Sequence, residues 1–174
     1  GSGLIRAVRE MLKAGVIEPS GRFRDRAMVD TGFTLGEDAA GVPILLTQKD
    51  IRQLQLAKAA LRAGIQLAMS RAGVTAADLD ALYLAGAFGN HIRPDDAVGL
   101  GLLPPVDLAR VRPIGNAAGT GAQVFLLSSE ARESASLLAS GGEHVELSVE
   151  PGFQDAFFGS MEFPPPQDGG RSRC

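Results

Sequence analysis

Two short apolar runs in the second half of the chain each end in a glycine-rich turn and lead into a helix-forming segment. Residues 81–85 precede the turn 86–90, and residues 111–114 precede the turn 115–121. Glycine lets the main chain approach a ligand closely, and the backbone N–H groups at the following helix start point toward it. Each turn alone is equally consistent with close packing of a helix on a strand. Two such turns, about 30 residues apart in one α/β unit, favour a nucleotide site.

The two turns lack the standard phosphate-binding signatures. No Gly-Lys-Ser/Thr follows either of them, and neither matches Gly-x-Gly-x-x-Gly. They are therefore neither Walker loops nor dinucleotide fingerprints. The prediction rests on their shared position after a strand and before a helix.

Strands and helices alternate along the chain, which predicts a layered α/β arrangement. The long helix starts at a capping-box pattern formed by Thr47 and Asp50, and a Thr75–Asp78 pattern starts a short helix. The run 81–85 lacks polar alternation and is predicted to be a strand covered on both faces. The long helix is predicted to run over 47–71. The other predicted helices are 4–14, one that opens at 93, one that follows the second glycine turn and ends near 140, and 151–160. The other predicted strands are 27–35, 43–47, 111–114 and 144–148.

Composition narrows the class of protein. The chain has 174 residues, 45% hydrophobic and 21% charged, as expected for one ordinary globular domain. A net charge of −3 without a basic, aromatic-rich cluster argues against nucleic acid as a partner. Cys174 is the only cysteine and the two histidines lie far apart, so no disulfide or metal site is predicted. No run approaches membrane-spanning length and no signal peptide is visible, so a cytoplasmic protein is expected, with a disordered tail over 164–174.

The start of the long helix carries a polar face. Lys49, Arg52 and Gln53 lie together by the i, i+3/i+4 rule. A solvated surface is the ordinary interpretation, and packing on an adenine ring is the alternative. The opposite face is predicted to be a core stripe, formed by Leu54, Ala57, Leu61, Ile65 and Ala68.

Two further motifs have mainly structural interpretations. Residues 27–32 read Ala-Met-Val-Asp-Thr-Gly, as in an aspartic protease loop, but Phe33 stands where a hydroxyl residue supports that loop. Asp30 is therefore interpreted as a turn residue at a strand edge. Near the C-terminus, Phe153, Phe157, Met161 and Phe163 form an apolar stripe, interpreted as core packing with a partner-facing patch as the alternative.

Several strings, in this order, resemble the C-terminal part of the reductive activators of corrinoid proteins, which are actin-like (ASKHA) ATPases. The likeness covers nearly all of residues 1–164. Arg6 departs from it, because the family tends to carry an acidic residue there. The matching strings are Gly-Ser-Gly-Leu-Ile at 1–5, Leu-Thr-Gln-Lys-Asp-Ile-Arg at 46–52, Leu-Gln-Leu-Ala-Lys at 54–58, Leu-Ala-Gly-Ala-Phe-Gly-Asn at 84–90, Gly-Asn-Ala-Ala at 115–118, and Met-Glu-Phe-Pro at 161–164 after Phe153 and Phe157.

The resemblance implies a fold and a role. The fold is an α/β, ribonuclease-H-like actin-like ATPase (ASKHA) lobe with a mixed sheet, helices on both faces and a helical insertion around 47–72. The family uses ATP, with Mg²⁺, to drive an electron from an N-terminal 2Fe–2S domain into Co(II) corrinoid, which regenerates Co(I). The partner is then a corrinoid protein or corrinoid-dependent methyltransferase, with a homodimer as a further possibility. Residues 1–163 are expected to be the C-terminal half of the ATPase domain, carrying the adenosine end without the phosphate loops and inactive alone.

The resemblance also implies nucleotide-binding residues in three groups. One group matches the adenosine-binding segment, one matches the second connecting helix, and one lies where superfamily members contact the nucleoside from a helix. A docking module for a corrinoid protein, and another ASKHA ATPase such as a kinase or dehydratase activator, are the alternatives. The three groups are Gly86, Ala87, Phe88, Gly89 and Asn90; Gly115, Asn116, Gly119 and Gly121; and Lys49, Asp50 and Gln53.

Overall fold

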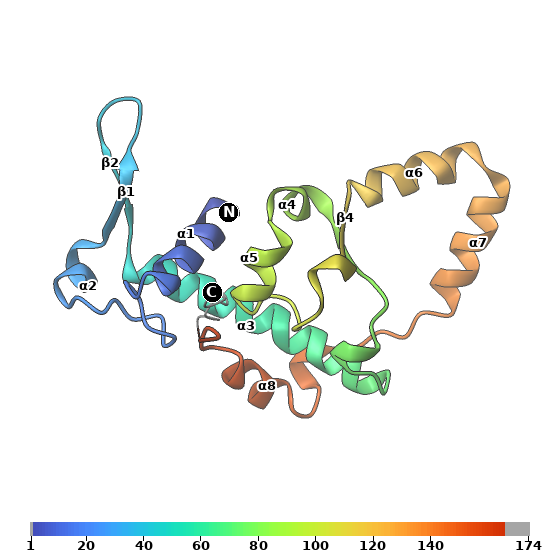
Figure 1. The fold of residues 1–174 in the computed structure, drawn as a ribbon. Coiled ribbons are helices and arrows are strands. Elements are labelled where there is room, and N and C mark those ends of the chain that lie inside the picture. The colour runs from blue at the N-terminus through green and yellow to red at the C-terminus, as the bar shows by residue number, and fades with distance from the viewer. Residues whose placement is uncertain (1, 166–174) are drawn as a thin grey trace, which may run out of the picture.

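The computed structural model describes residues 2–165 (Figure 1). Five of these residues are described by their backbone alone: Ser2, Ala87, Phe88, Asn90 and Ser148. The tail predicted over 164–174 lies, from residue 166 onward, outside the described residues.

Helix α1 (Ser2–Lys13) confirms the first predicted helix. Its apolar stripe faces the core, where Ile5, Val8, Met11 and Leu12 are buried. The chain leaves the helix at Gly15, whose φ of +71° is a conformation that glycine adopts without a steric penalty.

The predicted strand over 27–35 is wrong in its first half. Residues Ala27–Thr31 form helix α2, because the chain turns at Asp25, where Oδ1 accepts the Ala27 N–H (3.0 Å) and the carbonyl accepts the Met28 N–H (3.2 Å). Asp30 therefore lies on a helix and not at a strand edge. Strands β1 (Phe33–Glu37) and β2 (Pro43–Leu46) follow as an antiparallel hairpin that extends from the body of the molecule (Figure 1).

Helix α3 (Gln48–Arg71) is the central element, and it begins at the predicted capping box. The Asp50 N–H donates to Thr47 Oγ1 (3.2 Å), and the Thr47 N–H donates to Asp50 Oδ2 (2.9 Å). The predicted core stripe is only partly right, since Leu54 is buried whereas Ala57, Leu61 and Ala68 are exposed. The helix instead buries a face that includes Gln55 and Lys58.

Replacing Thr47 by alanine is expected to lower the free energy of unfolding by about 1 kcal/mol, because the first turn of α3 loses its capping oxygen. The hydrogen bond from the Thr47 side chain, and then that from its backbone, lower the pKa of Asp50 below 3.8. This contribution is present above pH 3.8 and is lost as the pH falls through the lower folded pKa. Urea unfolding at neutral pH checks the prediction, with exposed Gln53→Ala as the matched control. Equal losses in the two variants would contradict it.

The second half of the chain contains the parallel strand pair. Strand β3 (Leu82–Ala85) pairs with β4 (Val111–Gly115), with Leu82 opposite Val111. The alternating exposure of β3 differs from the predicted coverage on both faces, and Tyr83 is 57% exposed. The short 3₁₀ helix η1 (Ala76–Asp78) precedes β3. Between the two strands in sequence lie the helices α4 (Gly86–His91) and α5 (Pro94–Gly99) and the 3₁₀ helix η2 (Leu108–Arg110).

The C-terminal part is helical. The helix predicted after the second glycine turn is two helices, α6 (Ala117–Leu127) and α7 (Ser129–Ser140), which form an arm beside the body (Figure 1). Helix α6 begins within the predicted turn, because Asn116 caps it there. The break falls at Ser128, whose Oγ accepts from the Ala131 N–H (3.1 Å) and caps α7. The predicted strand at 144–148 is wrong, since residues Leu147–Val149 form the 3₁₀ turn η3. Helix α8 (Phe153–Gly159) is as predicted and packs along α3.

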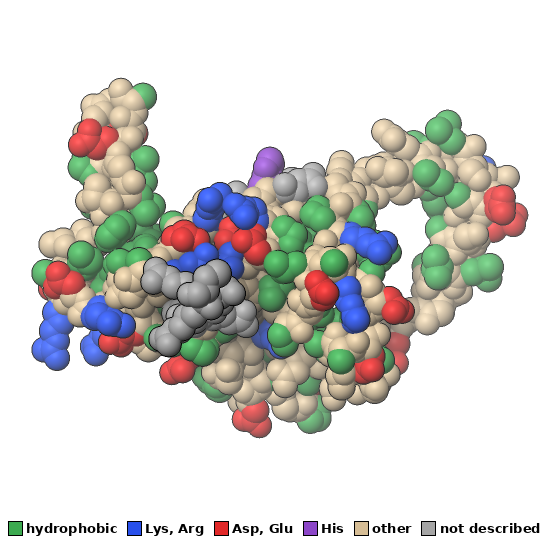
Figure 2. Space-filling view, viewed as in Figure 1, with side chains coloured by type: hydrophobic (Ala, Val, Ile, Leu, Met, Phe, Trp, Pro, Cys, Tyr) green, Lys and Arg blue, Asp and Glu red, His purple; other side chains and the backbone are tan. Residues whose placement is uncertain are grey.

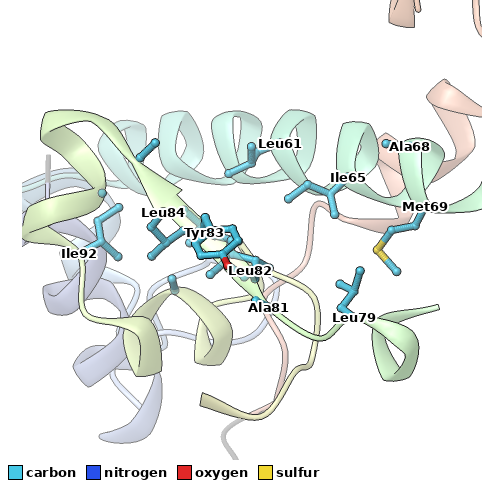
Figure 3. A pocket seen from close by; sticks show the side chains of 15 residues that line it. Leu61, Ile65, Ala68, Met69, Leu79, Ala81, Leu82, Tyr83, Leu84 and Ile92 are labelled. Atoms are coloured by element: carbon cyan, nitrogen blue, oxygen red, sulfur yellow. The ribbon is translucent and has the colours of Figure 1, made fainter. Parts of the chain in front are cut away.

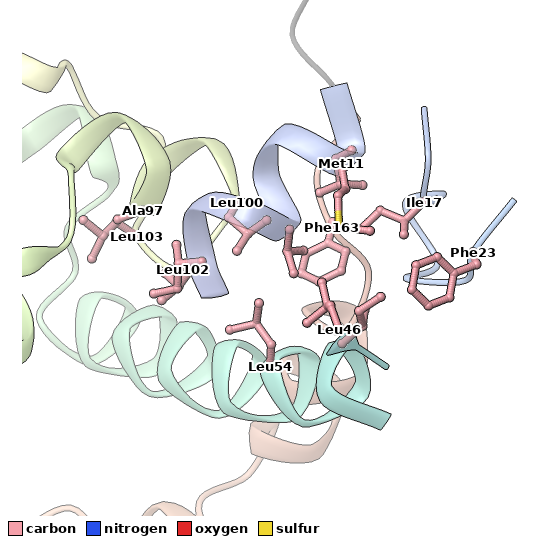
Figure 4. Close-up of a cluster of buried hydrophobic side chains, with 14 of the residues drawn as sticks. Met11, Ile17, Phe23, Leu46, Leu54, Ala97, Leu100, Leu102, Leu103 and Phe163 are labelled. Carbon is pink, nitrogen blue, oxygen red and sulfur yellow. The ribbon is translucent and has the colours of Figure 1, made fainter. Parts of the chain in front are cut away.

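The hydrophobic core lies where α1, α3 and α5 meet (Figure 4). Leu54 of α3, Leu100 and Leu102 after α5, and Met11 of α1 contribute to it. Phe163 enters the same cluster from the C-terminal segment and is 2% exposed. This observation confirms core packing for the end of the C-terminal apolar stripe.

Candidate functional site

The two glycine turns lie side by side. Strands β3 and β4 are parallel, so their carboxyl ends meet at one edge, and Ala85 is the register partner of Gly115. Gly86 (φ +89°) and Gly115 (φ +69°) turn the chain there in the left-handed region that favours glycine. The predicted adjacency of the turns is therefore present in the structure.

The glycines at this edge divide into two kinds. A Cβ built on Gly89 would lie 3.1 Å from the Leu84 carbonyl carbon, and one on Gly119 would clash with the Asn116 side chain. These two glycines serve close packing. A Cβ on Gly86 or on Gly121 would meet nothing within 4 Å. The backbone at these two positions faces open space, as a ligand that lies against the main chain requires.

Asn116 has a structural task at the start of α6. Its Oδ1 accepts the N–H of Gly119 (3.1 Å), and its carbonyl accepts that of Thr120 (3.0 Å). The N–H groups of Ala117 and Ala118, in the first turn of α6, remain available to a ligand. Both follow directly on the Gly115 turn.

The remaining predicted residues fall into two sets. Ala87, Phe88 and Asn90 lie in helix α4, and the structure describes only their backbone. Lys49, Asp50 and Gln53 sit at the far end of α3 and are not brought to the glycine turns. Leu61 is the first α3 residue lining the groove beside Gly89, and it lies 12 positions (61 − 49) after Lys49, or about 18 Å along a helix. The Asp50 carboxylate is also engaged by Thr47.

An apolar groove adjoins the first glycine turn (Figure 3). It encloses about 620 Å³ between α3 and β3. Leu61 and Ile65, which the sequence pattern assigns to the core, line one wall, and Tyr83, Leu84 and Gly89 line the other. A periodic pattern identifies an apolar face but does not say what covers it, so the sequence gives no signal for an open groove here.

Within residues 2–165, no group of three or more described His, Cys, Asp or Glu side chains is arranged to hold a metal ion. The same residues include no helix that is both long and apolar enough to cross a bilayer.

A parallel strand pair with glycine turns at one edge, flanked by helices, is an α/β arrangement. Residues 1–169 match the family described as the C-terminal domain of RACo, the ASKHA domain, and the chain belongs to this family. A solved reductive activator for corrinoid, iron–sulfur protein superposes on 97% of the chain and 28% of its own length, with a TM-score of 0.82 and 31% identity. The predicted fold class is confirmed.

Two curated relatives carry names that describe corrinoid chemistry. The corrinoid activation enzyme RamQ of Eubacterium limosum is 36% identical over 94% of this chain and 30% of its own length. A Co(II) methylated amine-specific corrinoid protein reductase of Methanosarcina barkeri is 29% identical over 60% of this chain and 17% of its own length. The chain thus spans less than a third of the relatives that it matches.

Proposed function

We propose that this chain forms the nucleotide-binding C-terminal part of an ATP-dependent reductive activator of corrinoid proteins. The names of the relatives support corrinoid activation over the kinase and dehydratase-activator alternatives. The single observation that carries nucleotide binding is the pairing of Ala85 with Gly115, which puts two glycine turns at one sheet edge. The partner is proposed to be a corrinoid protein or corrinoid-dependent methyltransferase, in the cytoplasm.

In the proposed binding mode, backbone groups and not charged side chains contact the nucleoside. The nucleoside lies against the main chain at Gly86 and Gly121, where no side chain intrudes, and the Ala117 and Ala118 N–H groups offer hydrogen bonds. Mg²⁺ accompanies the phosphates of ATP when bound. Nucleotide binding and hydrolysis then favour different conformations, and that difference is coupled to electron transfer toward Co(II) from a 2Fe–2S domain of the full-length protein.

ATP or ADP is expected to raise the melting temperature of this chain by roughly 5–10 °C at a hundredfold excess over Kd, because ligand binding to the folded state stabilises it by mass action. Gly121→Val puts a side chain into the open space beside α6 and is expected to abolish the shift. Gly159→Val, at another helical glycine with open space around it, is the matched control and keeps the shift. A thermal melt with and without nucleotide is the measurement.

Two results would contradict this proposal. One is a melting temperature that neither ATP nor ADP changes. The other is a nucleotide-induced rise in melting temperature that is equal in Gly121→Val and in the unaltered chain. We further propose that the chain binds ATP without turning it over, because its sequence holds no acidic, glycine-rich phosphate loop. Phosphate release above the uncatalysed rate would overturn that part alone.

A docking module is the second candidate, and one observation favours it. Helices α6 and α7 contain no buried residue, and the arm that they form is dotted with apolar side chains (Figure 2). Leu126 (75% exposed), Leu127 (88%) and Leu138 (78%) are the most exposed of these. If the chain docks onto a corrinoid protein or a second copy of itself, that protein raises the melting temperature and ATP does not.

A further inference from the structure

Helix α3 presents a polar stripe to the C-terminal segment. Gln55 Nε2 donates to the Met161 carbonyl (3.2 Å), and Lys58 Nζ donates to the Glu162 carbonyl (2.6 Å). Both side chains are almost wholly buried, at 1% and 2% exposure. Arg62 follows Lys58 by four residues and therefore lies on the same face. The stripe thus carries two cations into a partly buried region.

Lys58 and Arg62 line a cavity of about 430 Å³. Its walls come from α3, from the turn after α5 and from the segment after α8, which contributes Ser160, Glu162 and Phe163. A Cβ built on Gly101 (φ +80°) would lie 3.6 Å from Lys58 Nζ, at ordinary contact distance, and 3.0 Å from the Pro164 ring. The cavity is distinct from the apolar groove at β3, with which it shares only Leu103 among the residues that line the two.

The two cations lack a sufficient countercharge. Across residues 2–165, neither Lys58 nor Arg62 has a carboxylate within ion-pairing distance, and buried Arg62 Nη1 has no hydrogen-bond partner. Burial, followed by the charge of Arg62, lowers the pKa of Lys58 to about 8, and exposed Glu162 opposes this shift only in part. Buried donors of this kind are normally paired, because an unpaired one costs free energy.

Anchoring the C-terminal segment explains only part of this arrangement. It uses one N–H of Lys58 and places the ammonium 5.4 Å from the centroid of the Phe163 ring. It leaves the other Lys58 donors and Arg62 Nη1 without a role. A lysine beside an arginine fork is the donor set that proteins use for phosphate and carboxylate groups.

We propose that this cavity between α3, the turn after α5 and the C-terminal segment binds the phosphate or carboxylate group of a small molecule. Arg62 and Lys58 hold the oxyanion, and the apolar side chains of Val98, Leu103 and Phe163 contact the rest of the ligand. The site is independent of the proposed nucleotide site, because none of the predicted nucleotide-binding residues lines the cavity.

The test is a melt of the full chain titrated with inorganic phosphate at constant ionic strength, with acetate as a parallel probe. A saturable rise of several degrees is expected. Arg62→Gln is expected to weaken the apparent affinity at least about tenfold, through loss of the charge-assisted hydrogen bonds. Arg52→Gln, on the exposed part of the same helix, keeps the response, and so does Gly121→Val if the site is separate from the nucleotide site.

Each other outcome overturns the proposal. A rise that does not saturate and is equal in every variant reflects only the general exclusion of phosphate from protein surfaces. A saturable rise that survives in Arg62→Gln puts the anion elsewhere. A response lost in Gly121→Val and kept in Arg62→Gln assigns the phosphate to the glycine turns. Phosphate and acetate are distinguished by which of the two saturates at the lower concentration.

Discussion

Replacing Arg9 with methionine is expected to lower the free energy of unfolding by about 3–5 kcal/mol, because it breaks an ion pair with a buried carboxylate. Arg9 Nη1 donates to Asp95 Oδ2 (2.9 Å) and Asp96 Oδ1 (2.6 Å). Asp96 is only 4% exposed. Without Arg9 its buried carboxylate loses its counter-ion, and breaking a buried pair costs far more than breaking an exposed one.

Urea unfolding at neutral pH measures this effect, and Lys13→Met on the same helix is the control. Lys13 pairs with Glu10 (2.8 Å) at the exposed surface, so its loss is expected to cost less than about 0.5 kcal/mol. Equal losses in the two variants would show that the Arg9 network contributes no more than a surface pair.

Acid titration gives the Arg9 prediction a second readout. Burial alone would raise the pKa of Asp95, but hydrogen bonds from Arg9 and Arg93 outweigh it and hold the pKa below 3.8. The stabilisation is therefore present above pH 3.8 and is lost as the pH falls through the depressed folded pKa. Arg9→Met should flatten this acid limb, and an unchanged limb would assign the acid sensitivity to other carboxylates.

The Arg9 network also bears on the proposed site. It ties α1 to the first turn of α5, and α5 follows directly on α4 and the Gly86 turn. Arg9 lies over Gly99 so closely that a Cβ there would come within 2.6 Å of Nε. The ion pair thus fixes where α5, the second helix after the first glycine turn, packs against α1, although Arg9 is far from that turn in sequence.

Local signals were the part of the fold that sequence could predict. The Thr47–Asp50 and Thr75–Asp78 capping boxes and Pro94 at a helix start act within four residues, so the pattern contains the whole interaction. The strand predicted over 27–35 was wrong in its first half because a turn at Asp25 outweighed the β-propensity of a short apolar run. The coverage predicted for β3 failed because it depends on what packs against the strand.

In the candidate site, too, local features could be predicted from the sequence and long-range contacts could not. The adjacency of the glycine turns follows from two parallel strands and was predictable. The position of Lys49 and Gln53 was not, because it depends on where a long helix crosses the rest of the chain. The cavity beside Lys58 and Arg62 was not predicted. The Glu162 carbonyl that binds Lys58 comes about 100 residues later in the sequence, and a periodic pattern does not report contacts over that separation.

Phe163→Ala is expected to lower the free energy of unfolding by about 3–5 kcal/mol. The Phe163 ring is 2% exposed and fills the space between α1 and α3 (Figure 4), and its N–H donates to the Pro19 carbonyl (2.8 Å). Truncation removes the ring from a close-packed cluster and leaves a cavity, because the hydrogen bonds of the backbone at residues 161–163 hold the segment in place.

The matched control is Phe158→Ala, five residues earlier, whose ring is 68% exposed. Its removal is expected to change the free energy of unfolding by no more than about 0.5 kcal/mol. Urea unfolding of both variants decides whether the C-terminal segment is part of the core. A Phe163→Ala loss as small as that of Phe158→Ala would mean that the segment 161–164 only rests on α3, and the cavity beside Lys58 and Arg62 would then lack a fixed wall.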